Sequence, residues 1–303
     1  MPARAKTRHV FVPSAIDNSQ TAMQTSRMAP TPAPAPSTTY LDRPGGRIAY
    51  EVTGDGPLVV LVPGMGDLRA SYRMLAPALV ASGYRVATTD LRGHGDSDAT
   101  FSSYGDLETA DDIVALVEAL GSPAVVVGNS MGAGAAVCAA ADHPDLVTGL
   151  VLLGPFVRDG DVGALTRALM RVALAPPWAA ATWKAYLPRL YAGRLPADHG
   201  SYISRVVASI RRPGYARAFS RTTRISHAPA QARIHKVTAP TLVVMGEQDP
   251  DFPDPRVEAT WIADALGGTV AMVPDAGHYP QSQQPDVVAD AVQSFLLQVA
   301  PRA

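Results

Sequence analysis

The sequence has only one cysteine, Cys138, among its 303 residues. A single cysteine cannot form an intrachain disulfide and cannot supply the several thiolates of a structural zinc site. The fold must therefore be stabilised by packing, for which a 47% hydrophobic composition is ample. We expect the protein to act without a metal and without a cofactor.

Long hydrophobic runs and a strong net charge are also missing. Proline, glycine or charged residues interrupt every apolar stretch before it reaches the roughly 18–20 residues that span a bilayer. The apolar residues 10–12 are too few for a secretory signal. The formal net charge is -1, whereas nucleic-acid binding needs a concentrated basic surface. We therefore expect a cytoplasmic protein with no membrane span and no nucleic-acid partner.

Residues 1–38 differ in composition from the rest of the chain. Their end, residues 29–37, alternates proline with alanine, threonine or serine, which removes amide donors and favours an extended polyproline II backbone. We predict a disordered tail without chemistry. It could serve as a linker or targeting element, or be an extended start upstream of Met23 or Met28.

From residue 39 onward, short apolar runs rich in β-branched residues alternate with helical patterns. This alternation is typical of an α/β fold, in which helices flank a mostly parallel sheet. The alternation stops between residues 155 and 238, where a helical insertion is expected. The pattern predicts strands at 46–53, 58–62, 85–90, 124–128, 148–153, 241–246 and 269–273, and helices at 71–82, 106–120, 131–142, 256–266 and 286–299.

The sharpest motif is Gly-Asn-Ser-Met-Gly at residues 128–132. It follows a buried strand and precedes a helix rich in alanine and glycine, which is the context of a nucleophile elbow. A serine at such a turn has strained backbone angles, and Gly128 and Gly132 remove side chains that would collide there. Ser130 is therefore the candidate nucleophile.

With this motif in place, residues 40–300 resemble the α/β-hydrolase fold superfamily, in particular cap-bearing serine hydrolases of the esterase or lipase type. The resemblance implies an eight-stranded, mostly parallel sheet flanked by helices. It also implies that residues 39–154 and 239–303 form the catalytic domain and that residues 155–238 form a helical cap.

The resemblance implies the order nucleophile, acid, histidine along the chain. Asp249 follows the strand 241–246, and His278 follows the strand that ends at residue 273. These two residues are the candidate acid and base. Asp251 and Asp254 compete with Asp249, but Asp249 lies nearest the strand end, and acidic residues of such loops are usually solvated.

The other histidines do not follow the last strand. His94 lies in the loop 90–97, which resembles a packing loop of the family, and we interpret it as structural. The remaining histidines lie in the tail, at a helix end or in the insertion: His9, His143, His199, His227 and His235.

The resemblance also implies an oxyanion hole made of two backbone N–H groups. One belongs to Met131, at the start of the helix after the nucleophile, and the other to Met65. Relatives usually have histidine where this chain has Pro63. Because the amide of Met65 makes the contact, we expect the hole to be retained.

A serine nucleophile excludes the carboxylate chemistry of haloalkane dehalogenases and related epoxide hydrolases. A histidine base and its carboxylate would activate Ser130 for attack on a carbonyl, giving an acyl-enzyme. The primary hypothesis is hydrolysis of a carboxylic ester or related acyl bond in a small to medium substrate. Acyl transfer, perhydrolysis, C–C bond cleavage beside a ketone and a ligand-binding receptor with residual activity stay open, as does the oligomeric state.

The insertion is strongly basic. Residues 158–236 contain 14 lysines and arginines but only three acidic residues, which leaves the rest of the chain acidic. The arginines could pair with the acidic catalytic domain, or they could attract an anionic substrate. The aromatic residues that lie between them are expected to form mainly the core of the cap.

Overall fold

The computed structural model describes residues 37–160 and 163–300, so nearly all of the predicted tail lies outside the described residues. Eight strands form one sheet in the order β1-β2-β4-β3-β5-β6-β7-β8. Their bounds are β1 Thr39–Arg43, β2 Gly46–Thr53, β3 Leu58–Val62, β4 Arg85–Thr89, β5 Ala124–Asn129, β6 Val147–Leu153, β7 Thr241–Gly246 and β8 Thr269–Val273.

The sheet is mixed but mostly parallel, which confirms the predicted fold class. The pairs β1–β2 and β2–β4 are antiparallel, and the remaining neighbours are parallel. The apolar pattern predicted seven of the strands and missed β1. That strand has the sequence Thr-Tyr-Leu-Asp-Arg and is only partly buried at the sheet edge, so its hydrophobic signal is weak.

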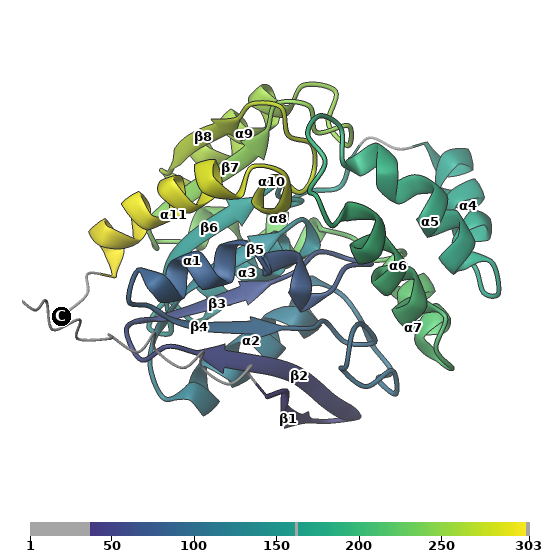
Figure 1. Cartoon of the computed structure of the whole chain (residues 1–303), viewed down its shortest axis with the longest axis horizontal. Coiled ribbons are helices and arrows are strands. Elements are labelled where there is room, and N and C mark those ends of the chain that lie inside the picture. Colours follow the sequence, from purple (N-terminus) through teal and green to yellow (C-terminus); the bar gives the residue numbers. More distant parts are fainter. Residues whose placement is uncertain (1–36, 161–162, 301–303) are drawn as a thin grey trace, which may run out of the picture. The chain divides into compact units, whose positions relative to one another are not determined.

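Helices cover both faces of the sheet (Figure 1). Side chains of β3 alternate between the two faces: Val60 and Val62 pack with helices α2, α3 and α9, while Val59 and Leu61 pack with α1 and α11. The central strands β3 and β5 are buried along their whole length. The bounds of these helices are α1 Leu75–Ala81, α2 Asp106–Leu120, α3 Met131–Asp142, α9 Pro255–Leu266 and α11 Pro285–Val299.

The predicted helix at 71–82 is the one clear departure among these elements. The structure has a 3-10 turn at Arg69–Tyr72 followed by the shorter helix α1. Pro77 has no backbone N–H to donate to the carbonyl of Arg73, so a continuous helix would lose a hydrogen bond there.

The predicted insertion forms a group of helices between β6 and β7, as expected for a cap (Figure 1). Trp183, Tyr191, Tyr202 and Phe219 are buried in its own hydrophobic cluster, whereas Trp178 is exposed. Among the described helices, none is both long and apolar enough to cross a membrane. The helices of this region are α4 Ala164–Ala173, α5 Ala179–Leu190, α6 His199–Ile210, α7 Tyr215–Thr222 and α8 Ala228–Gln231.

Candidate active site

The candidate residues lie at the same edge of the sheet. Strands β5, β6, β7 and β8 are parallel, so their carboxyl ends lie on the same side. Ser130 directly follows β5, Asp249 follows β7 and His278 follows β8. Residues separated by more than a hundred positions in the sequence are therefore brought to one place by the topology.

Ser130 has the strained backbone that the elbow motif predicts. Its φ is 55° and its ψ is -122°, although it is not a glycine. A Cβ on Gly128 would lie 2.4 Å from the carbonyl oxygen of Gly132, and one on Gly132 would lie 2.6 Å from that of Pro63. Both glycines are thus sterically required by the turn that presents Ser130 at the start of α3.

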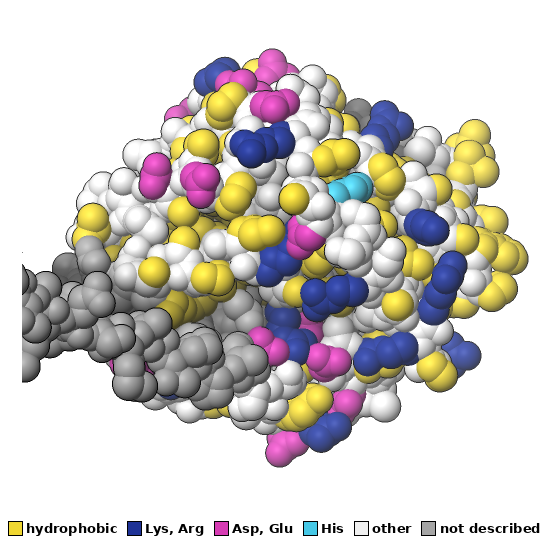
Figure 2. Space-filling model, viewed as in Figure 1, with side chains coloured by type: hydrophobic (Ala, Val, Ile, Leu, Met, Phe, Trp, Pro, Cys, Tyr) yellow, Lys and Arg dark blue, Asp and Glu magenta, His cyan; other side chains and the backbone are white. Residues whose placement is uncertain are grey.

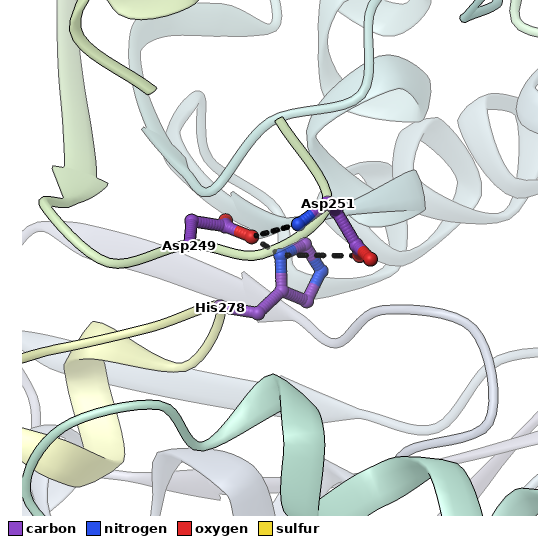
Figure 3. A group of neighbouring side chains, drawn as sticks. All are labelled: Asp249, Asp251 and His278. Atoms are coloured by element: carbon purple, nitrogen blue, oxygen red, sulfur yellow. Dashed lines mark hydrogen bonds and ion pairs between the residues drawn. The ribbon is translucent and has the colours of Figure 1, made fainter. Parts of the chain in front are cut away.

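His278 is paired with Asp249. The imidazole Nδ1 lies 2.8 Å from Oδ2 of Asp249, and both side chains are buried (Figure 3). In the neutral imidazole, Nδ1–H donates to the carboxylate and Nε2 is left as the acceptor. Burial alone would lower the pKa of His278, but the charge and hydrogen bond of Asp249 outweigh it and raise the pKa to about 9.

The two competing carboxylates have different positions. Asp254 caps helix α9 by accepting from the backbone N–H groups of Arg256 and Val257. Asp251 lies against His278, with its Oδ2 3.7 Å from Nδ1, and its side chain is only 16% exposed. The interpretation of Asp251 as a solvated loop residue is therefore wrong; its backbone N–H bonds to Asp249 and turns its side chain inward.

Asp249, Asp251 and His278 also form a group of possible metal ligands. One donor atom from each lies within 4.8 Å of the others, and this is the one such group among the residues that the structure describes. The hydrogen bonds within the group account for the same spacing without an ion. We therefore interpret it as a proton-handling pair with a second carboxylate.

The loop after β3 approaches Ser130 closely. A Cβ on Gly64 would lie 2.8 Å from Cβ of Ser130, so the loop at Met65 borders the nucleophile. The next residue, Gly66, is held through both of its backbone polar groups. Its N–H donates to Nε2 of His94, and its carbonyl accepts from Nε1 of Trp183. This arrangement fixes the segment that contains the candidate amide of Met65.

His94 has the structural role that the sequence predicts, but it supports the site directly. Its Nδ1 lies 2.8 Å from the carbonyl oxygen of Arg92 and its Nε2 lies 3.0 Å from the backbone nitrogen of Gly66. The first contact requires a proton on Nδ1 and the second a lone pair on Nε2, which defines one neutral tautomer. Burial lowers the pKa of His94 to about 4, so this tautomer persists at neutral pH.

Sequence reasoning missed one residue that joins two parts of the site. Asn129 precedes the candidate nucleophile, and its Nδ2 donates to the carbonyls of Leu153 and His278. It is fully buried. Its place within the elbow motif was the available signal, but the two acceptors lie at the end of β6 and in the loop after β8, and they cannot be inferred from local spacing.

Several basic residues of the cap pair with acids of the catalytic domain. Lys and Arg side chains gather over the cap helices in Figure 2. In the opposite sense, Arg73 of the catalytic domain pairs with Asp198 of the cap. Ion pairs across the boundary between the cap and the catalytic domain therefore account for part of the charge asymmetry. They are Arg158–Glu258, Arg212–Asp96 and Arg233–Asp142.

Comparison with known proteins agrees with the fold. A 2-(acetamidomethylene)succinate hydrolase of Mesorhizobium japonicum is 29% identical over 265 residues, which cover 83% of this chain and 92% of the relative. A pyrrolizixenacetamide deacetylase of Xenorhabdus hominickii is 28% identical over 258 residues, covering 83% of this chain and 95% of the relative. The crystal structure of a bromoperoxidase from Bacillus anthracis has a TM-score of 0.75 at 21% identity, covering 86% of this chain and 99% of that one. Residues 57–285 match the alpha/beta hydrolase fold family, and the chain therefore belongs to it.

Proposed function

We propose that this protein is a serine hydrolase that cleaves a carboxylic ester or related acyl bond through Ser130, His278 and Asp249. The observation that carries the proposal is the combination of two features at one sheet edge. Ser130 is held at φ 55° on the elbow, and His278 is paired at 2.8 Å with a buried carboxylate. Strained nucleophiles and buried histidine–acid pairs are the components of acyl transfer chemistry.

In this mechanism His278 accepts the proton of the Ser130 hydroxyl as its oxygen attacks the carbonyl carbon. Asp249 stabilises the imidazolium that forms and keeps Nδ1 protonated. The proton then passes from Nε2 to the leaving group, which departs and leaves an acyl-enzyme. Water then attacks the acyl carbonyl and transfers a proton to His278. His278 returns this proton to the oxygen of Ser130 as the tetrahedral intermediate collapses, which releases the acid and restores the enzyme.

The negative oxygen of each tetrahedral intermediate needs two donors. The backbone N–H of Met131 is one, because it lies at the N-terminus of α3, where amides lack helical partners. The N–H of Met65 is the other, since its loop borders Ser130. The support of the adjoining Gly66 by His94 and Trp183 keeps this loop in place.

The relatives suggest which acyl bonds to test. The names of both curated relatives contain an acetamide, and one of them is a deacetylase. Beyond its two carboxylate neighbours, His278 lies beside aromatic rings: the ring of Phe156 is 5.7 Å from the imidazole and that of Phe252 is 4.9 Å from Phe156. We therefore propose a small to medium substrate whose acyl part is mainly apolar, with short-chain esters and N-acetyl amides as the first choices.

The test combines covalent labelling with turnover. A fluorophosphonate should label the unaltered protein at Ser130, and the protein should turn over a p-nitrophenyl acetate or an aryl acetamide. Ser130→Ala should fold normally and lose both labelling and at least three orders of magnitude of turnover. Full activity of Ser130→Ala would disprove the proposal, and slow labelling without turnover would favour a ligand-binding receptor.

A further inference from the structure

Cap helix α5 contacts three loops that bear the candidate active-site groups. The side chains of Trp183 and Tyr186 are spaced i, i+3 and lie on the same side of the helix, and Leu190 contributes its backbone carbonyl at the C-terminal end of the helix. Nε1 of Trp183 donates to the carbonyl of Gly66 at 2.8 Å. Gly66 lies in the loop after β3 that contains Met65, which we call the oxyanion loop. The carbonyl of Leu190 accepts from the backbone N–H of His278 at 2.8 Å.

The middle contact reaches the acid loop. Oη of Tyr186 donates to Oδ1 of Asp251 at 2.6 Å. The other oxygen of Asp251 faces Nδ1 of His278 at 3.7 Å, and its backbone N–H donates to Asp249 at 3.1 Å (Figure 3). A chain of contacts thus runs from the cap through Asp251 to both members of the histidine–acid pair.

We propose that Tyr186 is a positioning residue that acts through Asp251 on His278. Helix α5, which also provides the contacts of Trp183 and Leu190, sets the relative positions of the three loops. This inference rests on the function proposed above. The cap, in this arrangement, is part of the machinery that aligns the reacting groups, in addition to covering the site.

The geometry gives Asp251 a defined effect. An anionic oxygen 3.7 Å from Nδ1 favours the imidazolium, adding to the stronger effect of Asp249. Tyr186 fixes the carboxylate by holding its other oxygen, so the orientation of Asp251 depends on the position of α5. The other acidic group that raises the pKa of His278 is Asp67, which lies in the oxyanion loop and accepts from the hydroxyl of Tyr202, whereas Tyr186 bonds to Asp251.

The experiment measures the second-order rate of fluorophosphonate labelling of Ser130 across pH, because that rate reports nucleophile activation without knowledge of the substrate. Tyr186→Phe removes one hydroxyl and should slow labelling about fivefold. Asp251→Asn removes the second charge and should lower the pH midpoint of the rate by about one unit. The double variant should be no slower than Asp251→Asn alone, because the two residues act in series.

A matched control is available on the same cap. Tyr215 donates from Oη to the carbonyl of Ser97 at 2.9 Å, so Tyr215→Phe also removes one hydrogen bond between cap and catalytic domain, at the loop after β4 instead of at the loops of Asp251 and His278. It should leave both the rate and its pH midpoint unchanged. Trp183→Phe should slow labelling without moving the midpoint, because its contact is with the oxyanion loop.

Two failures can be told apart. If Ser130→Ala is labelled as fast as the unaltered protein, the proposed function is wrong. If Ser130 is labelled but Tyr186→Phe behaves as Tyr215→Phe, or if the effects of Tyr186→Phe and Asp251→Asn simply add, the function stands and the positioning role of Tyr186 is wrong.

Discussion

Nε2 of His94 accepts a hydrogen bond from the backbone N–H of Gly66 at 3.0 Å. The two residues are 28 positions apart, on the loops after β4 and β3, and the bond is buried. His94 therefore supports the loop that contains Met65 from a neighbouring loop.

Replacing His94 with alanine tests this support. The buried N–H of Gly66 would lose its acceptor, which should cost about 1–3 kcal/mol of the free energy of unfolding. Turnover should also fall, because the donor amide of the adjoining Met65 loses its fixed position. Urea unfolding and labelling kinetics measure the two effects, with His143→Ala at an exposed helix end as the control. An unaltered turnover number in His94→Ala would show that His94 does not position the donor amide of Met65.

The pH dependence of turnover follows from the pKa of His278. Only the neutral imidazole can accept the serine proton, and Asp249 raises the pKa of His278 to about 9. The value of kcat/KM should therefore increase with pH from neutrality, with its midpoint near pH 9, and level off only above that pH. Asp249→Asn should lower this midpoint as well as the maximal rate. A profile already flat at pH 7 would contradict the paired, buried imidazole.

Buried Asp67 should make stability depend on pH. Burial raises its pKa to about 6, against an ordinary value of 3.8, and its Oδ2 has no hydrogen-bond partner. Between these values the folded protein binds a proton that the unfolded chain has released. The stability that Asp67 contributes is therefore fully present below pH 3.8 and is lost as the pH rises to about 6, a loss of about 3 kcal/mol.

Asp67→Asn isolates this effect. Asparagine keeps the oxygen that accepts from Tyr202 and from the backbone of Leu68, but it does not titrate. The free energy of unfolding of both proteins is measured in urea from pH 4 to pH 7. As the pH rises, the value for the variant minus the value for the unaltered protein should increase. Parallel curves for the two proteins would show that Asp67 keeps its ordinary pKa.

The sequence was sufficient for features whose signals are local. The buried runs of β3, β5 and β7 and the glycines around Ser130 each follow from residue type and spacing, so the fold class and the elbow could be predicted. Contacts between distant loops could not. The link from Tyr186 to Asp251 spans 65 positions, and that from Trp183 to Gly66 spans 117. Such pairs depend on how the cap packs on the sheet, which no local pattern specifies.

The cap arginines provide a last prediction, on the choice between pairing and substrate capture. Arg158 bonds to Glu258 and lies over the ring of Trp261, with its side chain 35% exposed. Arg158→Gln should lower the melting temperature at low ionic strength by an amount that corresponds to about 1 kcal/mol, and by less in concentrated salt, because salt screens partly exposed pairs. Arg171→Gln on the exposed helix α4 should leave it unchanged.

If the cap arginines act by pairing with the catalytic domain, the ratio of kcat/KM for a carboxylated ester to that for a neutral ester of matched size should not change with salt. A field that captures anions would give the carboxylated ester an advantage at low ionic strength that disappears as salt is added. Measuring both rate constants and the melting temperature at each salt concentration separates the two effects. A salt-dependent preference in a protein whose melting temperature is insensitive to salt would assign the arginines to the substrate instead of to the catalytic domain.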